Sequence, residues 1–481
     1  MEKKTSWRIG IIALLCCALV LCAVWAVVRP GEPADQPAVA ADASAEQDND
    51  ESAAADASSE SLTERNQGWI SDIRFLQQTF TDEHPAPFWL LPQEDFDRQI
   101  DELIEQVPKL SDLEIGMELQ RIVAQIGDQH SQVYFYEGLS AYPFDFYMND
   151  DGTVYLYQIR SADFETNQYI LDYYQVVQIN KVDIQYIINR LRPLSSSGSS
   201  AYGYTQDMEF LLCYRDVLKE IGIPCEGDTD TFTLLDEQKQ AFDIELAPFA
   251  SSEETKLVDY IDDKHLRDNQ PVTIPLLLQN QQQNYWYKYL EDEKALFFSI
   301  AHFDTHEDKN SSEIFEQDIQ RMYTFFEEKN AEKLVIDLRG CPGGEAPLAN
   351  VLIDNVRAKL EISKNTYILI NSQTYSAGVV CARELSEECT LVGAPTGGTP
   401  WGFSKKEYVL PYSELVFNCG HFYYDGEIMY ENALFHSPQF KMINFFPPEW
   451  ESTVMPDVYI STDIQDLAEG RDPALEWVLA Q

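Results

Sequence analysis

Apolar and polar positions follow three different patterns along this chain of 481 residues, and the changes between them divide it into blocks. Between residues 65 and 138 apolar residues recur at helical spacing. A first helix should start near Trp69, with one face made of Ile70, Ile73, Leu76 and Phe80. Two further helices are expected over residues 91–107 and 112–126, the second capped by Ser111 or Asp112 and stopped by Gly127.

From about residue 139 to 250 the pattern becomes that of strands with interruptions, which predicts a separate α+β module. The strand-like segments are "GTVYLYQIR", "YYQVVQINKVDI", "DTFTLLD" and "AFDIELAP". Helices should intervene at "IQYIINRL" (residues 184–191) and at "MEFLLCYRDVLKEIG" (residues 208–222). A variable region up to residue 284 leads out of this module.

The last block, residues 285–481, alternates regularly between strand-like and helix-like segments. Its strands "EKLVIDL" and "NTYILIN" are nearly continuous apolar runs, as expected for strands covered on both faces. The alternation predicts an α/β domain with largely parallel strands, in which ligands bind at the carboxyl ends of the strands. Antiparallel strands are expected later, in "EYVLPYSELVF" and "GHFYYDGEIMY".

The N-terminus predicts a membrane anchor. Residues 1–8 are basic, and residues 9–28 are an uninterrupted apolar run long enough to span a bilayer as a helix. Residues 29–64 are rich in Ala, Ser, Asp and Glu, and they predict a disordered acidic spacer. Positive charge before the run and acidic residues after it place residues 1–8 in the cytoplasm and the rest of the chain outside.

The formal net charge of −47 argues against a nucleic-acid partner, because phosphate binding requires clustered Lys and Arg. It also argues against adhesion to an anionic membrane surface, so the membrane should be contacted through the N-terminal helix alone. Six of the nine cysteines follow the spacer, with no zinc-binding spacing. One or two disulfides are compatible with an oxidising compartment, but scattered buried thiols are the simpler interpretation.

Two strand-to-helix turns could carry chemistry. The first, "LRGCPGGEAP", places Gly343 and Gly344 at its tip, and the second, "NSQTYSAGVV", places Ser376 there. A serine at a helix start is exposed, and the N–H of the next residue, Ala377, is not used inside the helix. Side by side, the turns would supply a nucleophile and oxyanion donors, which is the minimal equipment for acyl transfer. Either turn alone also fits helix capping.

Several segments resemble peptidase family S41, the group of C-terminal processing and tricorn-like proteases. They are "KLVIDLRGCPGGEAPLANVLI", "YILINSQTYSAGVVCARELSE", "TLVGAPTGG", the upstream "IVAQIGDQHSQV" and the C-terminal "MPDVYISTDIQDLAEGRDPALEWVL". The resemblance covers most of the chain after the spacer. It implies a crotonase-like α/β catalytic core, a polypeptide substrate and no cofactor or metal. It also implies that Ser376 is the nucleophile and that Gly343, Gly344 and Ala377 are oxyanion donors.

The general base departs from the pattern of the processing proteases, in which a lysine follows the serine. Here Thr399, which cannot be the base at neutral pH, holds that position. Lys405 and Lys406 lie a few residues further on, and a dyad of Ser376 with either lysine is an alternative mechanism. Cys341 also replaces an asparagine of the family motif.

Tricorn-like members instead use an upstream histidine and a glutamate near the C-terminus, which correspond here to His130 and to Glu451, with Glu449 as the alternative. A histidine base suits neutral pH and needs a carboxylate to orient it. Asp128 could cap or orient the histidine loop, and Asp337 with Arg339 should form a structural pair.

The middle module resembles a degenerate PDZ domain at "VVQINKVDIQYI", but no carboxylate-binding loop is evident, so a preference for C-termini does not carry over. The sequence thus predicts a membrane-anchored extracytoplasmic serine endopeptidase that cleaves unfolded or extended polypeptides. The alternative is a catalytically inactive S41-like peptide-binding or sensor protein, motivated by the absent lysine. An acyl-CoA enzyme of crotonase type is a third possibility, against which the anchor argues.

Overall fold

The computed structural model describes residues 50–163, 165–197, 200, 202–248, 255–305, 311–359, 365–425, 428–430 and 453–481. The predicted anchor, residues 9–28, and the two glutamates Glu449 and Glu451 lie outside these residues. Among the helices of the described ranges, none combines the length and the apolar character needed to cross a bilayer.

Three helices form the N-terminal part: α3 (Asp50–Glu83), α4 (Gln93–Gln106) and α5 (Asp112–Ala124). Ser111 caps α5 in a reciprocal capping box with Glu114, as one of the two predicted caps. Helix α3 begins at Asp50 rather than near Trp69, so residues 50–64, which the sequence placed in the spacer, belong to the helix. Alanine and glutamate favour helix. The spacing of apolar residues cannot reveal a helical extension that contains almost no large apolar residues.

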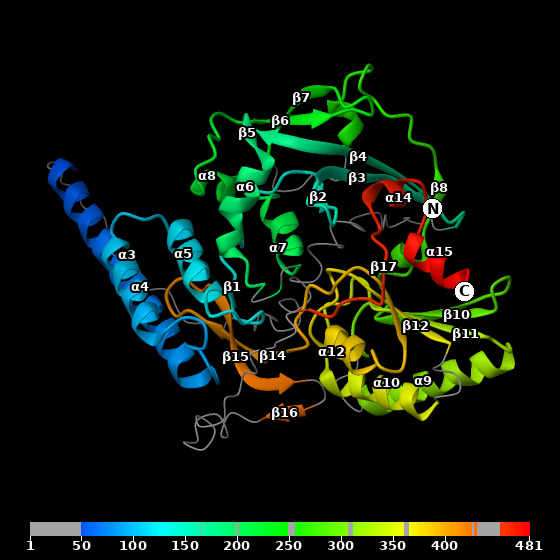
Figure 1. The fold of residues 1–481 in the computed structure, drawn as a ribbon. Coiled ribbons are helices and arrows are strands. Elements are labelled where there is room, and N and C mark those ends of the chain that lie inside the picture. The colour runs from blue at the N-terminus through cyan, green and yellow to red at the C-terminus, as the bar shows by residue number, and fades with distance from the viewer. Residues whose placement is uncertain are drawn as a thin grey trace, which may run out of the picture.

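These helices pack against a four-stranded sheet whose strands come from both ends of the chain (Figure 1). The strands are β1 (Gln132–Val133), β14 (Trp401–Val409), β15 (Val416–Asp425) and β16 (Ile428–Tyr430). Strands β14 and β15 are antiparallel, as predicted. Strand β1, just after α5, pairs with β15 through Gln132 and Asn418. This pairing joins the end of the helical region to the C-terminal part of the chain.

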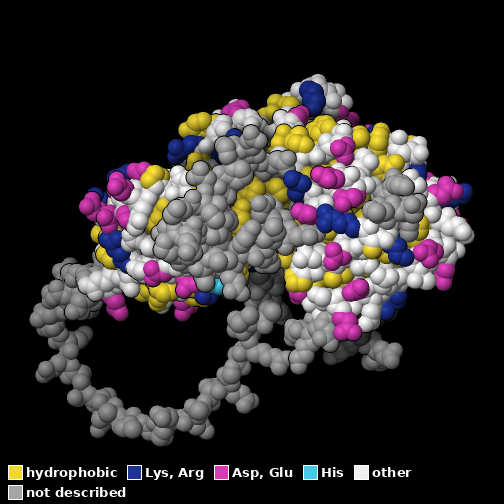
Figure 2. Space-filling model, turned by 60° about the horizontal axis from the view of Figure 1, so that its bottom comes forward, with side chains coloured by type: hydrophobic (Ala, Val, Ile, Leu, Met, Phe, Trp, Pro, Cys, Tyr) yellow, Lys and Arg dark blue, Asp and Glu magenta, His cyan; other side chains and the backbone are white. Residues whose placement is uncertain are grey.

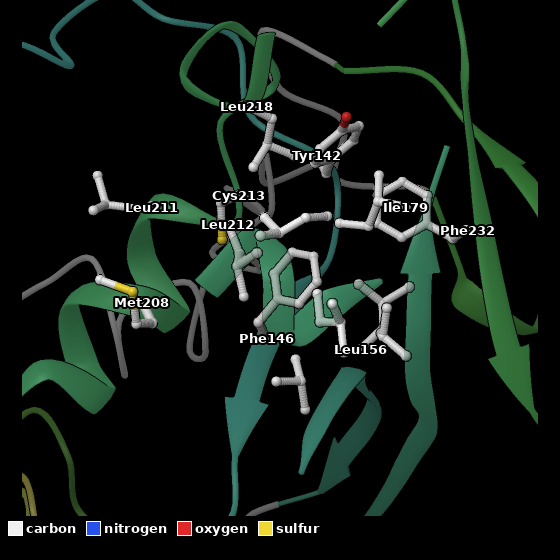
Figure 3. Close-up of a cluster of buried hydrophobic side chains, with 14 of the residues drawn as sticks. Tyr142, Phe146, Leu156, Ile179, Met208, Leu211, Leu212, Cys213, Leu218 and Phe232 are labelled. Carbon is white, nitrogen blue, oxygen red and sulfur yellow. The ribbon is translucent and has the colours of Figure 1, made fainter. Parts of the chain in front are cut away.

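The middle module is a seven-stranded antiparallel sheet with helices on one face (Figure 1). Its strands are β2 (Asp145–Met148), β3 (Val154–Asp163), β4 (Gln168–Ile179), β5 (Val182–Asp183), β6 (Asp230–Leu235), β7 (Ala241–Leu246) and β8 (Val272–Thr273). Its helices are α6 (Ile184–Leu191), α7 (Tyr204–Leu211) and α8 (Arg215–Glu220). Figure 3 shows Phe146, Leu156 and Phe232 of the sheet facing Leu212 of the helical layer in one buried cluster.

The single helix predicted over residues 208–222 is wrong, because the structure has two short helices there. Tyr214 forms an isolated β-bridge with Ala141, and the Tyr142 N–H donates to the Cys213 carbonyl at 2.8 Å. These bonds use backbone groups that a continuous helix would need for itself.

The C-terminal core contains a six-stranded sheet in the order β17-β13-β12-β11-β10-β9. Its strands are β9 (Tyr285–Leu290), β10 (Ala295–Ile300), β11 (Lys333–Asp337), β12 (Thr366–Ile370), β13 (Thr390–Gly393) and β17 (Val458–Tyr459). All neighbours pair in parallel except the edge strand β9, so the predicted α/β domain with parallel strands is confirmed.

Helices cover both faces of this sheet (Figure 1). On one face lie α9 (Ser311–Glu328), α10 (Ala346–Ala358) and α12 (Ala377–Glu384), and on the other α15 (Pro473–Leu479). A short helix, α14 (Ile464–Ala468), packs against the middle module. Because β11 and β12 are parallel neighbours, the turns that follow them emerge side by side at the same edge.

Candidate active site

Ser376 sits at the tip of the turn that joins β12 to α12. Its backbone has φ 48° and ψ −123°, a conformation that a residue with a side chain adopts only under strain. Strained strand-to-helix turns of this kind expose a serine nucleophile in hydrolases of other folds. The next residue, Ala377, is the first of the helix, so its N–H points out of the helix end beside the serine.

The glycine turn after β11 lies directly against the serine turn. Gly343 has φ +108°, and a methyl group on its Cα would stand 2.6 Å from Ser376 Cβ and 2.8 Å from the Ala377 nitrogen. Gly344, with φ +135°, forms an isolated bridge to Phe303 in the segment after β10. Only glycine leaves the space in front of the serine and the Ala377 N–H open. The structure therefore brings the four predicted residues of the two turns together.

Two sets of hydrogen bonds fix the turns to each other. The Asn371 side-chain oxygen accepts from the Gly340 N–H at 3.3 Å and from the Gln373 N–H at 3.0 Å. The Tyr375 N–H donates to the carbonyl of Cys341 at 2.9 Å. Cys341, which replaces the family asparagine, is fully buried, and burial raises the pKa of its thiol to about 12. It is therefore an uncharged packing residue at neutral pH.

His130 reaches Ser376 although 246 residues separate them. The His130 Nε2 and Ser376 Oγ atoms are 3.2 Å apart, within hydrogen-bond distance. The histidine follows α5 and precedes β1, and the pairing of β1 with β15 carries this loop to the carboxyl edge of the core sheet. Both side chains are partly accessible.

A buried carboxylate holds the histidine loop in place. Asp128 accepts from the His130 N–H at 3.1 Å through Oδ1 and from the Ser131 hydroxyl at 2.6 Å through Oδ2. His84 Nε2 lies 3.3 Å from the same Oδ2, while its Nδ1 accepts from the Ala86 N–H at 3.1 Å. Since Nδ1 is the acceptor, Nε2 carries the proton and donates to Asp128. His84 was not singled out in the sequence, because its spacing from other polar residues carries no recognisable signal.

Burial keeps His130 neutral at neutral pH. Burial lowers the pKa of His130 below its usual value; the Asp128 carboxylate opposes this, and the Lys405 ammonium adds to it. For Asp128, burial alone would raise the pKa, but the hydrogen bond from His84, electrostatic interactions with the His84 and His130 rings and the Ser131 hydroxyl together lower it. At neutral pH the site thus pairs an ionised Asp128 with a neutral His130, the form that can accept a proton from serine.

Thr399, at the family lysine position, is a buried structural residue. Its hydroxyl contacts the Trp401 carbonyl at 2.5 Å and the Gln129 side-chain oxygen at 3.2 Å. Lys406 extends to Glu83 at 3.4 Å. Lys405 is exposed and acts on His130 through its charge. No hydrogen bond between either lysine and Ser376 is present among the described residues.

The expected pair of Asp337 and Arg339 is present and has a third member. Arg339 binds Asp337 through Nε at 2.9 Å and Nη2 at 2.7 Å, and binds both carboxylate oxygens of Asp472 at 2.7 Å. All three residues are buried. The triad ties the C-terminal segment to the base of the glycine turn and does not contact the serine turn's nucleophile. The six cysteines after the spacer are all free, as the simpler interpretation predicted, and all but Cys225 are buried.

The comparisons with known proteins place this geometry in a class. No family model matches the chain, and no curated protein matches it. Among solved structures, mature CPAF complexed with lactacystin shares 13% identity and a TM-score of 0.55, over 86% of this chain and 97% of CPAF. A second structure of mature CPAF gives 12% identity and a TM-score of 0.54, over 86% and 96%.

The photosystem II D1 C-terminal processing protease is also similar, with 12% identity over 85% of this chain and 98% of that chain, but its TM-score of 0.37 is too low to support an argument. Several of the matching structures, CPAF among them, are peptidases of family S41. The chain therefore has the fold of S41 peptidases, as its motifs predicted.

Proposed function

We propose that this chain is a serine peptidase of S41 type in which His130, rather than a lysine, is the general base. The observation that carries the proposal is the 3.2 Å distance between His130 Nε2 and Ser376 Oγ. Ser376 Oγ attacks the peptide carbonyl while its proton passes to His130 Nε2. The protonated imidazole then gives this proton to the leaving amine, and a water molecule repeats the sequence on the acyl-enzyme.

In this mechanism the two turns bind the oxyanion. The Ala377 N–H, at the start of α12, is one donor, and the Gly343–Gly344 turn supplies the other. Asp128 fixes the histidine loop, and its negative charge stabilises the imidazolium. Glu451, or alternatively Glu449, would orient the other ring nitrogen, as the resemblance to tricorn-like proteases implies.

The substrate class and location complete the proposal. Unfolded or extended polypeptides are the expected substrates of an S41-type endopeptidase. The apolar run of residues 9–28 supports a single-pass anchor with the peptidase on the extracytoplasmic side. Figure 2 shows acidic side chains spread over the visible face and interspersed with Lys and Arg, which supports the view that the net charge is a solvated surface.

Proteolysis of reduced casein by the full chain in detergent micelles tests the proposal. Ser376→Ala and His130→Gln should each lower kcat/KM by at least about a thousandfold, since the pair acts as a unit. Lys405→Gln and Lys406→Gln should retain cleavage. Loss of cleavage in Lys405→Gln with His130→Gln active would make a lysine the base. If the folded wild-type chain cleaves no polypeptide, the inactive peptide-binding alternative takes the place of this proposal.

A further inference from the structure

A second feature of the carboxyl edge has no part in the mechanism above. A cavity of about 280 Å³ lies between the strand ends of the core sheet and the sheet of the middle module. Its floor is made by the residues that follow β10, β11, β12, β13 and β17, including Gly340, Ser372 and Ala394. Its roof comes from β3, β4 and the segment before β9, including Ile159, Leu171 and Leu278.

The cavity shares its floor with the candidate active site. Two residues of the floor lie close to the site in sequence: Gly340 is three residues before Gly343, and Gln373 is three residues before Ser376. The Asn371 side chain accepts hydrogen bonds from the backbone of both Gly340 and Gln373. Three extended residues span at most about 10 Å, so this part of the floor lies within about 10 Å of the serine. A polypeptide bound at Ser376 could therefore place a side chain here from within about three residues of the scissile bond.

The interior of the cavity carries little net charge. The Arg339 guanidinium in its wall is already paired with the carboxylates of Asp337 and Asp472, so it does not act as an unpaired cation. Burial raises the pKa of Glu209 to about 8, so this wall carboxyl is protonated at neutral pH. Asp150 is exposed, at the edge of the lining. A charged group entering such a cavity would lose its hydration without finding a counter-ion, whereas an apolar group would gain by burial.

We propose that this cavity is a specificity pocket for one large, uncharged apolar side chain of the polypeptide substrate, up to three residues from the scissile bond. The aliphatic and tyrosine side chains in the lining, among them Ile159, Leu171 and Leu278, fit such a side chain. This inference rests on the proposed peptidase function and adds the residue type that the peptidase selects.

Cleavage of a peptide series by the full chain tests the inference. The peptides share one alanine-rich sequence and carry Phe, Ala, Lys or Asp at each of three positions on either side of the bond. Wild type should cleave the best Phe peptide with kcat/KM roughly 10- to 100-fold above its Ala counterpart, the range of apolar pockets. Leu278→Trp, which fills the cavity, should remove that preference, and Ile159→Lys should shift it to Asp. Leu266→Trp, at an exposed leucine outside the lining, should change nothing.

A binding arm separates this inference from the peptidase proposal. Fluorescence anisotropy of the same labelled peptides on Ser376→Ala, with and without Leu278→Trp, reports the pocket without catalysis. A Phe preference that Leu278→Trp removes supports the pocket, even if wild type cleaves nothing and the peptidase proposal fails. If wild type and Leu278→Trp are both folded and active and show the same residue preference in cleavage and in binding, the specificity-pocket proposal is wrong. The peptidase proposal would still stand.

Discussion

Asp128→Asn is the substitution that probes the candidate site most directly. The carboxylate accepts three hydrogen bonds, from the backbone of His130 and from the side chains of Ser131 and His84. An asparagine has the same shape but only one acceptor oxygen, and its amide group is a donor. Whichever way the amide turns, at least one of the three donors then faces another donor in a buried place.

The expected loss of stability follows from these three hydrogen bonds. One buried donor without an acceptor costs about 1–3 kcal/mol, and exchanging a charged acceptor for a neutral one costs about 1 kcal/mol more. The free energy of unfolding should therefore fall by roughly 2–4 kcal/mol. The lost charge also lowers the pKa of His130 further, because the Asp128 carboxylate raises it. At an effective dielectric of about 20, a nearby carboxylate stabilises an imidazolium by roughly a few kcal/mol, which predicts a fall in kcat/KM on the order of a hundredfold.

Two assays separate the effects. Urea unfolding measures the loss of stability, and kcat/KM on casein peptides between pH 5 and 9 measures the loss of activity. Ser131→Ala is the matched control, because it removes one hydrogen bond to Asp128 and leaves the charge. It also removes the hydroxyl that accepts from the buried Gly420 N–H at 3.1 Å, so it should destabilise the protein by about 1–3 kcal/mol while leaving the pH profile in place. An Asp128→Asn protein that is folded and keeps both the wild-type kcat/KM and its acid limb would refute the reasoning.

Three further predictions concern charge and backbone. Lys405→Gln should raise the pKa of His130, because the Lys405 charge lowers it, and should move the acid limb of kcat/KM to higher pH. Lys406→Gln should leave the acid limb in place, because the Lys406 ammonium pairs with Glu83; equal shifts in the two variants would contradict the assignment. Gly343→Ala should abolish casein cleavage, because its methyl group would block the proposed oxyanion site. Gly138→Ala, at φ +78° with open space around it, is the control and should lower only the stability. An active Gly343→Ala chain would argue against the oxyanion role. The pKa of Glu209 is about 8 in the folded chain and about 4.5 in the unfolded chain, so wild-type stability falls as pH rises between these values. In urea unfolding, Glu209→Gln should be more stable than wild type by about 3 kcal/mol at pH 7, and this gain should vanish near pH 4.5. A stability difference that does not depend on pH would refute this prediction.

The parts of the fold that sequence reasoning found are those in which local pattern and tertiary environment agree. The parallel strands of the core are buried on both faces, so β11 and β12 read as apolar runs and their order along the chain gives their order in space. That is why the two turns could be placed side by side. The break between α7 and α8 was missed because it depends on a bridge between Tyr214 and Ala141, which no local pattern reveals.

The residues of the candidate site also fall into those that a local sequence pattern reveals and those whose position depends on contacts between distant segments. Gly343, Gly344, Ser376 and Ala377 were found because each stands at a strand-to-helix turn. His130 was found only through the resemblance, since its approach to the serine depends on β1 pairing with β15. His84 and Asp472 were missed as partners, because the carboxylate that His84 contacts lies 44 residues away along the chain and the guanidinium that Asp472 binds lies 133 residues away. His84 has no distinctive local motif, and the C-terminal motif that contains Asp472 does not reveal its partner.

Because β15 positions His130, the site can assemble only late in the synthesis of the chain. Synthesis proceeds from the N-terminus, so the histidine is made 246 residues before the serine, and the strand that positions it is made later still. No growing chain shorter than about residue 425 contains all of β15, so the pair cannot assemble until β15 has emerged. The proposed peptidase would therefore be harmless to its neighbours, and to its own unfolded segments, throughout most of its biosynthesis.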